Sequence, residues 1–272
     1  MQRRPRASAL AATGLVALAL AATVGDASPA EAPVGAKAAR TGPVRVLLLG
    51  DSLIATEFGL AFQELLNKTP GFLSKRRARS ATGLARQDVF DWIRASRQAV
   101  AFRRPELVIV MIGSNDAQDV VPPVKRRRRP QAFRRVNWEK PAWSTAYRAR
   151  VNRLLDQLAA PHREVLWLEL PVMRSRRLDK KLQKVRQAQR AAVLARPQDA
   201  DFLGLVPLMQ SLGSPKETRR RRWRRFRRDG VHFSLRGSQL LARMVLPVVQ
   251  AIAPRAYMHR FAPRPTAPPS AP

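Results

Sequence analysis

Five residues of this sequence have the types and spacing needed for nucleophilic acyl transfer: Ser52, Gly83, Asn115, Asp229 and His232. A serine hydroxyl is a weak nucleophile and needs a neighbouring base to accept its proton. Histidine suits that role because the pKa of its side chain lies near neutral pH. Of the three histidines, His232 in "RRDGVHFS" is the one in a useful place, directly before a predicted final helix. These residue types indicate attack by a serine on a carbonyl carbon.

The remaining groups would support the serine and the histidine. Asp229 stands three residues before His232, a spacing that lets its carboxylate reach the imidazole Nδ1 and stabilise the imidazolium. The carbonyl oxygen of an attacked ester becomes an oxyanion, which requires preorganised hydrogen-bond donors. The backbone N–H groups of Ser52 and Gly83 and the side-chain amide of Asn115 would supply three donors. The sequence therefore predicts a Ser–His–Asp triad with an oxyanion hole, which needs neither a metal nor a cofactor.

Each of these residues also has a structural interpretation. Ser52 alone is a good N-cap for the helix that follows it, and Asn115 and Asp116 are common turn residues after a strand. We expect Asp116 to hold its loop, and Asp51 to brace the turn before Ser52, rather than to react. His232 alone could be an ordinary surface histidine. The joint presence of Ser52, Asn115 and His232 favours catalysis.

Alternating strands and helices would position these residues. Continuous apolar runs predict buried strands, and apolar residues at helical spacing predict helices. The expected strands are 44–49, 78–81, 106–113, 164–171 and 200–207. The expected helices are 57–67, one that starts at Asp88, 142–160, 178–195 and 234–253. No hairpin turn joins two strands, so the pattern predicts an α/β fold in which helices cover both faces of a parallel sheet. In such sheets, sites form at the carboxyl ends of the strands.

Four blocks of the sequence, in order, resemble those of the SGNH (GDSL-type) hydrolase superfamily. They are Gly50-Asp51-Ser52-Leu53, Gly83, Gly113-Ser114-Asn115-Asp116 and Asp229-Gly230-Val231-His232. More narrowly, "TGLARQDVFDW", "MIGSNDAQD", "LWLELPVMR" and "DGVHFSLRG" are similar to an exported subgroup whose substrates are largely unassigned. The resemblance covers Val44 to Ala253 and implies a flavodoxin-like three-layer α/β/α sandwich. It also implies a nucleophile at Ser52, a base at His232 with Asp229 as its partner, and oxyanion donors at Gly83 and Asn115.

The two ends of the chain differ in composition from its middle. An arginine-rich start, an apolar run from Ala7 to Val24 and then small residues have the layout of a secretory signal peptide, cleaved between Ala27 and Ala32. An uncleaved membrane anchor is the alternative, although the run is barely long enough to span a bilayer. The length of 272 residues suits one globular domain. The predicted segments are a signal peptide 1–32, a linker 33–43, an SGNH hydrolase domain 44–256 with basic insertions near 117–140 and 212–228, and a disordered proline-rich tail 257–272.

The formal net charge of the chain is +32, and many of its cations lie in the blocks "KRRRR" (125–129) and "RRRRWRRFRR" (219–228). In a cytosolic protein such blocks would suit nucleic acid. Export leaves lipid headgroups, lipopolysaccharide and acidic wall polymers as polyanions, and a merely solvated, arginine-biased surface is an equal alternative. The absence of cysteine excludes disulfides, thiolate metal sites and lipoprotein acylation. With three histidines and no cysteine, a dedicated transition-metal site is disfavoured.

These inferences predict an exported serine esterase or acyltransferase in the periplasm or envelope. Its substrate would be an O-acyl ester, in particular an O-acetyl ester, of an envelope carbohydrate, and an acyl-enzyme would pass the acyl group to water or an acceptor hydroxyl. The alternative is a non-catalytic polyanion-binding envelope protein on an SGNH scaffold, because a fold alone does not establish activity. Specific nucleic-acid binding conflicts with export, whereas electrostatic contact with anionic lipid or polysaccharide does not. Arg174, which follows a strand end, is a candidate contact for an anionic substrate.

Overall fold

A computed structural model describes residues 42–123, 135–210, 226 and 229–258 of the protein. The predicted signal peptide and most of the predicted linker lie outside these residues. The same holds for both arginine-rich blocks, apart from residue 226, and for the predicted tail from residue 259 onward. The boundaries of those segments therefore stay predictions.

Five parallel strands form one sheet in the order β2-β1-β3-β4-β5. The strands are β1 (Val44–Gly50), β2 (Phe72–Ala78), β3 (Leu107–Met111), β4 (Glu164–Leu168) and β5 (Asp201–Leu203). All of β3 and nearly all of β1 are buried, as expected for aliphatic runs that helices cover on both faces. Gly50 pairs with Met111 at the ends of β1 and β3. The segments that follow these two strands therefore start side by side.

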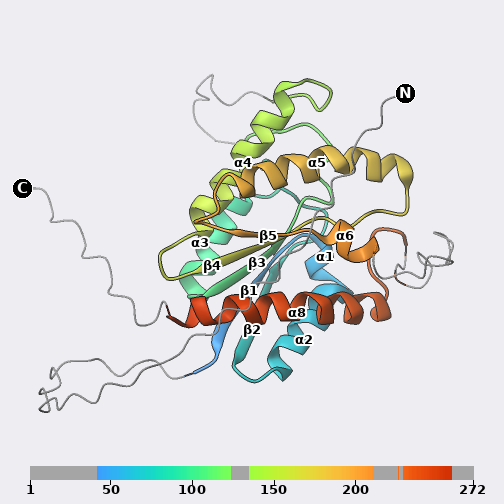
Figure 1. Cartoon of the computed structure of the whole chain (residues 1–272). Helices are drawn as coiled ribbons and strands as arrows, with labels where there is room; N and C mark the ends of the chain where they lie inside the picture. Colours follow the sequence, from blue (N-terminus) through green and yellow to red (C-terminus); the bar gives the residue numbers. More distant parts are fainter. Residues whose placement is uncertain (1–41, 124–134, 211–225, 227–228, 259–272) are drawn as a thin grey trace, which may run out of the picture. The chain divides into compact units, whose positions relative to one another are not determined.

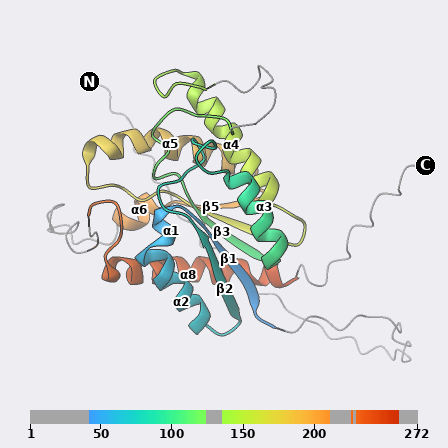
Figure 2. The same cartoon turned by 180° about the vertical axis from the view of Figure 1, so that it is seen from behind.

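Helices cover both faces of the sheet, which confirms the predicted three-layer α/β/α architecture. They are α1 (Ser52–Ala55), α2 (Glu57–Lys68), α3 (Trp92–Arg103), α4 (Ala142–Leu158), α5 (Arg176–Leu194), α6 (Leu205–Gln210) and α8 (Leu235–Met258). Figure 1 and Figure 2 show α2 beside α8 on one face and α3, α4 and α5 on the other. The starts of α5 and α8 lie at the same edge of the sheet as α1 (Figure 1). No helix within the described residues is long and apolar enough to cross a membrane.

The predicted strand at 78–81 was misplaced, because β2 runs from Phe72 to Ala78. β2 is an edge strand, and its burial alternates: Ser74 is buried, whereas Leu73 and Lys75 are exposed. An alternating polar strand does not give the continuous apolar run that identified β1 and β3. This difference in burial explains the error.

Other predicted boundaries were also wrong. The helix predicted to start at Asp88 starts at Trp92, with the Asp91 carboxylate accepting a hydrogen bond from the backbone N–H of Arg94 (3.1 Å). Asp88 instead binds the Arg86 guanidinium through two hydrogen bonds of 2.8 and 2.6 Å. Of the strand predicted over 200–207, only three residues form β5, and α6 starts two residues later. The last helix, α8, runs to Met258, two residues into the predicted tail.

The two ends of the predicted basic loop 117–140 are joined. Val120 and Val136 exchange two backbone hydrogen bonds of 2.9 Å, and Val120 is buried. The carboxylate of Asp119 accepts a further bond from the backbone N–H of Trp138 (2.7 Å). The central residues, 124–134, lie outside the described part of the chain. The base of the insertion is also bonded to the segment that precedes α3, because the backbone N–H of Val121 donates to the carbonyl of Ala85 (2.7 Å).

Candidate active site

Ser52 is the first residue of α1, directly after β1, and its side chain is largely buried, with the residue 9% exposed. Asp51 is the N-cap of this short helix, because its carboxylate accepts a hydrogen bond from the backbone N–H of Leu53 (3.0 Å). The carbonyl of Ser52 accepts bonds from the backbone and the hydroxyl of Thr56 (3.0 and 2.7 Å). Both ends of the turn are therefore held, and the position of the serine is fixed by its neighbours.

The other oxygen of the Asp51 carboxylate joins the end of β1 to the end of β3. It accepts hydrogen bonds from the backbone N–H of Gly113 (2.9 Å) and from the backbone N–H and the hydroxyl of Ser114 (both 2.8 Å). Burial raises the pKa of this carboxyl, although all four hydrogen bonds lower it. The expected bracing role of Asp51 is confirmed by these contacts, which fix the Gly113–Asp116 segment beside Ser52.

Asp116 connects that segment to the Gly83 segment. Its buried carboxylate accepts hydrogen bonds from the backbone N–H groups of Leu84 (2.8 Å) and Ala85 (2.9 Å) and from the hydroxyl of Tyr147 (2.7 Å). Burial raises the pKa of Asp116 to about 6, although these hydrogen bonds lower it. The prediction that Asp116 holds its loop is confirmed.

Asn115 also binds the Gly83 segment. Its side-chain Nδ2 donates to the carbonyl of Thr82 (2.9 Å) and, at a longer distance of 3.3 Å, to the Ser114 hydroxyl. Thr82 directly precedes Gly83, so the structure brings together the segments of all three predicted oxyanion donors.

Position 83 has no room for a side chain, which explains the glycine there. A Cβ atom at this position would lie 2.0 Å from Oδ1 of Asp116, an oxygen that already accepts a hydrogen bond from the backbone N–H of Ala85. We expect Gly83→Ala to lower the free energy of unfolding by about 3 kcal/mol through overpacking, measured by urea denaturation. Ala81→Gly, two residues away at a positive φ of 57°, should stay within about 1 kcal/mol of the wild-type protein. Equal stability of the two variants would contradict this packing argument.

Asp229 and His232 form the predicted pair. Oδ2 of Asp229 lies 2.7 Å from Nδ1 of His232, and Oδ1 accepts the backbone N–H groups of Val231 and His232 (both 2.8 Å). Partial burial opposes ionisation of Asp229, but the bonds from His232 and Val231 outweigh it and lower the pKa of this carboxyl well below its usual range. Gly230 has a φ of +93°, a conformation that suits glycine and closes this tight turn.

The second ring nitrogen of the histidine is unoccupied. Nε2 of His232 is buried and has no hydrogen-bond partner among the residues that the structure describes. It is therefore not bonded to the Ser52 hydroxyl. A buried ring nitrogen normally finds a partner, so Nε2 is the atom of this pair that is available for a proton transfer.

Sequence reasoning missed the groups that support these segments. Nε2 of Gln189 on α5 donates to the Tyr147 hydroxyl (3.0 Å) and to the carbonyl of Ile112 (2.7 Å). Tyr147 lies on the buried face of α4, among aliphatic residues. A tyrosine among aliphatic residues on a buried face needs a partner for its hydroxyl, and that signal could have indicated a polar contact.

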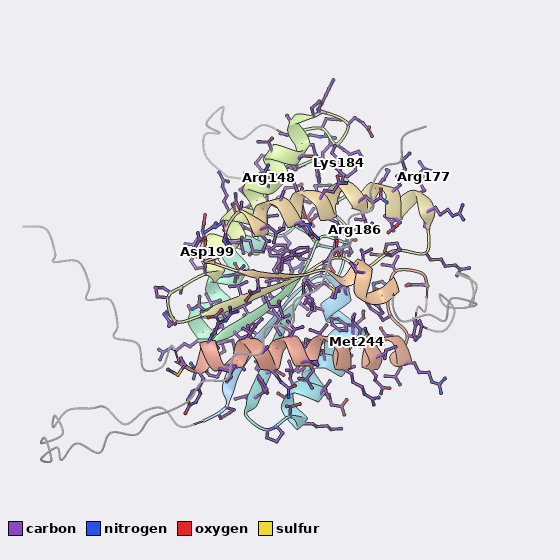
Figure 3. The ribbon with its side chains drawn as sticks, viewed as in Figure 1. Arg148, Arg177, Lys184, Arg186, Asp199 and Met244 are labelled. Carbon is purple, nitrogen blue, oxygen red and sulfur yellow. The ribbon has the colours of Figure 1, made fainter. Side chains whose placement is uncertain are left out.

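A second support, also missed, holds the segment after β4. Oδ1 of Asp179 accepts hydrogen bonds from the backbone N–H of Met173 (2.9 Å) and from the buried guanidinium of Arg186 (3.1 Å). Arg186 lies on the side of α5 that faces the sheet (Figure 3). The next residue, Arg174, donates its backbone N–H to the carbonyl of Gly230 (2.8 Å). The Asp229–His232 turn is thus tied to α5 through this segment.

Solved structures with the same fold include two SGNH-type or α/β hydrolases. LAE5, an α/β hydrolase enzyme from the metagenome of Lake Arreo, Spain, has a TM-score of 0.51 and 14% identity over 78% of this chain and 97% of its own. A protein of Slackia heliotrinireducens assigned to the SGNH hydrolases has a TM-score of 0.51 and 18% identity over 76% of this chain and 100% of its own. The protein therefore has the fold of the SGNH hydrolases, as the four sequence blocks predicted.

The particular family is narrower. The chain belongs to the DUF459 family, whose model, described as a protein of unknown function, matches residues 45–248. No curated protein matches the sequence significantly.

Proposed function

We propose that this protein is an exported serine esterase or acyltransferase that acts on O-acyl, and in particular O-acetyl, esters of envelope carbohydrate. The observation that carries the proposal is the state of His232. Its Nδ1 is held by the ionised Asp229, while its Nε2 is buried and free of partners among the described residues. An imidazole oriented in this way is ready to accept a proton. In a histidine with a purely structural role, a buried ring nitrogen normally has a hydrogen-bond partner.

The reaction uses this geometry in two halves. Oγ of Ser52 attacks the carbonyl carbon of the ester as its proton passes to Nε2 of His232. The imidazolium returns that proton to the departing alcohol oxygen, which leaves an acyl group on Ser52. Water or an acceptor hydroxyl then attacks the acyl carbon, with His232 taking its proton, and the serine is regenerated when the proton returns to Oγ. Asp229 stabilises the imidazolium in both halves.

The oxyanion of each tetrahedral intermediate would be stabilised by the backbone N–H groups of Ser52 and Gly83 and by Nδ2 of Asn115. An asparagine amide has two N–H donors. The shorter bond of Asn115, to Thr82, positions the amide, and the N–H in the 3.3 Å contact with Ser114 is the one that would turn to the oxyanion. The contacts of Asp51 and Asp116 supply the rigidity that such donors require.

The carbohydrate substrate and the periplasmic or envelope location rest on the predicted signal peptide and on the exported subgroup that the sequence blocks resemble. No residue that we identify chooses between water and a sugar hydroxyl as the acceptor. The proposed substrate class is therefore the acylated glycan itself, and both outcomes of the second half-reaction belong to the proposal.

A fluorophosphonate probe tests the activated serine directly. The probe loses fluoride when Oγ of an activated serine attacks its phosphorus, and the product is a stable covalent adduct. We expect the purified protein to be labelled at Ser52 and to hydrolyse p-nitrophenyl acetate, and Ser52→Ala to do neither. Ser80→Ala, which changes an exposed serine outside the contacts of the site, is the matched control and should keep both activities. Folded protein that is neither labelled nor active on short acyl esters would contradict the proposal and favour a non-catalytic, polyanion-binding scaffold.

A further inference from the structure

Five cations lie together where the segment after β4 enters α5: Arg174, Arg176, Arg177, Lys180 and Lys181, here called the α5 basic cluster. All five are exposed. The four on the helix follow the spacing i, i+1, i+4 and i+5, so they share one side of it across about one turn of roughly 5.4 Å. Figure 3 shows Arg177 near the start of α5. This surface belongs to the described residues, and none of its cations is part of the two arginine-rich blocks of the sequence.

The positive charge of the cluster is not neutralised within its own segment. The one acid there, Asp179, is already paired with the buried Arg186 and with the backbone of Met173. None of the five cations has an ion pair to another described residue. Lys184, further along α5, differs, because its Nζ donates to the carbonyl of Trp138 (2.6 Å) and lies over the rings of Trp138 and Trp143. The Lys184 ammonium group serves the packing of the domain, whereas no contact of this kind is made by the charged groups of the cluster with the described residues.

The cluster adjoins the proposed catalytic turn. The backbone N–H of Arg174 donates to the carbonyl of Gly230 (2.8 Å), between Asp229 and His232. The aliphatic part of the Arg174 side chain lies against Gly230: its Cβ, Cδ and Cγ atoms would be 2.6, 3.0 and 3.3 Å from a Cβ built on that glycine. An anion bound at Arg174 would therefore lie beside the turn that carries His232, the proposed base.

We infer that the α5 basic cluster binds the anionic groups of the substrate, and that the substrate is a glycan with repeating carboxylate or phosphate groups beside its O-acyl esters. This inference rests on the proposed esterase or acyltransferase function. Arginine matches the planar, bidentate geometry of both kinds of anion, and cations one turn apart can bind successive charges of a polymer.

The lack of exposed large apolar side chains in the cluster segment favours a glycan over a membrane as the binding partner. A helix that lies in a membrane interface places large apolar side chains next to its cations. In the cluster segment no large apolar side chain is exposed, and Leu194, the exposed leucine of α5, lies at the opposite end of the helix. A soluble polyanion needs only the charges.

The test measures binding and site protection with variants matched in charge. Arg174→Gln/Arg176→Gln/Arg177→Gln removes three charges from the cluster, and glutamine keeps the Cβ, Cγ and Cδ atoms that contact Gly230. Lys75→Gln/Arg97→Gln/Arg103→Gln removes three exposed charges from β2 and α3. Binding is measured by titration calorimetry on Ser52→Ala forms of the full chain. The probes are oligogalacturonate for carboxylates, poly(glycerol phosphate) for phosphates and a xylo-oligosaccharide as a neutral control. Thermal unfolding and circular dichroism check that each variant is folded.

We expect at least one of the two anionic probes to bind, with a Kd that rises about tenfold in the cluster variant, the combined effect of three exposed ion pairs, and less than threefold in the control. Added salt should weaken this binding. The same probe should protect Ser52 from the fluorophosphonate in the wild-type protein, and the cluster variant should need about tenfold more of it.

Three results would overturn the inference. Equal weakening in the two charge-matched variants would mean that binding reflects net charge alone. Binding without protection of a labelled Ser52 would place the anion away from the site, with the proposed function intact. Loss of binding to phosphatidylglycerol vesicles in the cluster variant, with no binding of either anionic probe, would make the cluster a membrane contact. Failure of the wild-type protein to be labelled at all would instead overturn the proposed function and, with it, the substrate role of the cluster.

Discussion

Replacing Asp116 with alanine is expected to lower the free energy of unfolding by about 3 to 6 kcal/mol. The substitution leaves the backbone N–H groups of Leu84 and Ala85 and the hydroxyl of Tyr147 without an acceptor. Each buried polar group left unsatisfied costs about 1–3 kcal/mol. Because domains are stable by only about 5–15 kcal/mol, the variant should be strongly destabilised in urea denaturation, or fail to fold.

A matched aspartate provides the comparison. Asp156 pairs with Arg196 at the surface, where its side chain is 53% exposed, and Asp156→Ala should cost below about 1 kcal/mol. Similar costs for the two alanine variants would mean that Asp116 does not brace the segments around the site.

The pH dependence of stability tests the environment of the Asp116 carboxyl without removing its side chain from the wild-type protein. Burial raises the pKa of Asp116 to about 6, above its value in an unfolded chain, so the native state binds the proton more tightly than the unfolded state does. Stability from this group is therefore greatest below about pH 4 and is lost as the pH rises towards 6. Relative to Asp116→Asn, the wild-type protein should gain about 2 kcal/mol when the pH is lowered from about 7 to about 4.5. A pH-independent difference would contradict the raised pKa.

Replacing His232 with glutamine is expected to lower kcat for p-nitrophenyl acetate on the order of 10⁴-fold, with a much smaller change in KM. Glutamine fills similar space but cannot accept and return a proton at the position of Nε2. The loss should fall on kcat, because deprotonation of Ser52 belongs to the transition state. The rate of fluorophosphonate labelling should fall in parallel.

Two variants separate this effect from simple loss of structure. His162→Gln changes an exposed histidine outside the site and should keep the wild-type rates. Asp229→Asn keeps the turn but removes the negative charge beside Nδ1, and should cost about 10² to 10⁴-fold in kcat. A His232→Gln protein that is labelled at the wild-type rate would remove His232 from the proposed mechanism.

The sequence predicted the parts of the fold in which burial is complete. β1 and β3 lie under helices on both faces, so their residues form continuous apolar runs, and α4 shows the helical stripe of a buried face. The position of β2 was not predicted correctly, because this edge strand buries only alternate residues and gives no continuous apolar run. The N-cap of α3 is Asp91, three residues after Asp88, because Asp88 binds the neighbouring Arg86 instead. Caps and edges depend on which neighbour a side chain meets, and single-sequence patterns do not contain that information.

The residues of the candidate site were predicted more fully than the contacts that hold them. The positions of Ser52 and Asn115 follow from strand ends and residue type, and that of His232 from residue type and from its place before the last helix. Tyr147 bonds to Asp116, 31 residues earlier in the chain, and to Gln189, 42 residues later. These two hydrogen bonds form together only when α4 and α5 pack against each other. Arg186 and Asp179 belong to the same helix, but Asp179 also accepts the backbone N–H of Met173, which fixes the segment that meets Gly230. These contacts between different elements are properties of the folded chain.

The edge strand β2 also bears on how copies of this domain can meet. An open strand edge is a template for pairing with another chain, and lysine and arginine side chains on the edge oppose it. β2 exposes Lys75 and Arg77 along its length, so two such edges repel each other. The opposite edge, β5, has only three residues, too few for a stable ladder. We therefore expect any self-association of the domain to use its helical faces. Strands of two copies should not pair to form one continuous sheet.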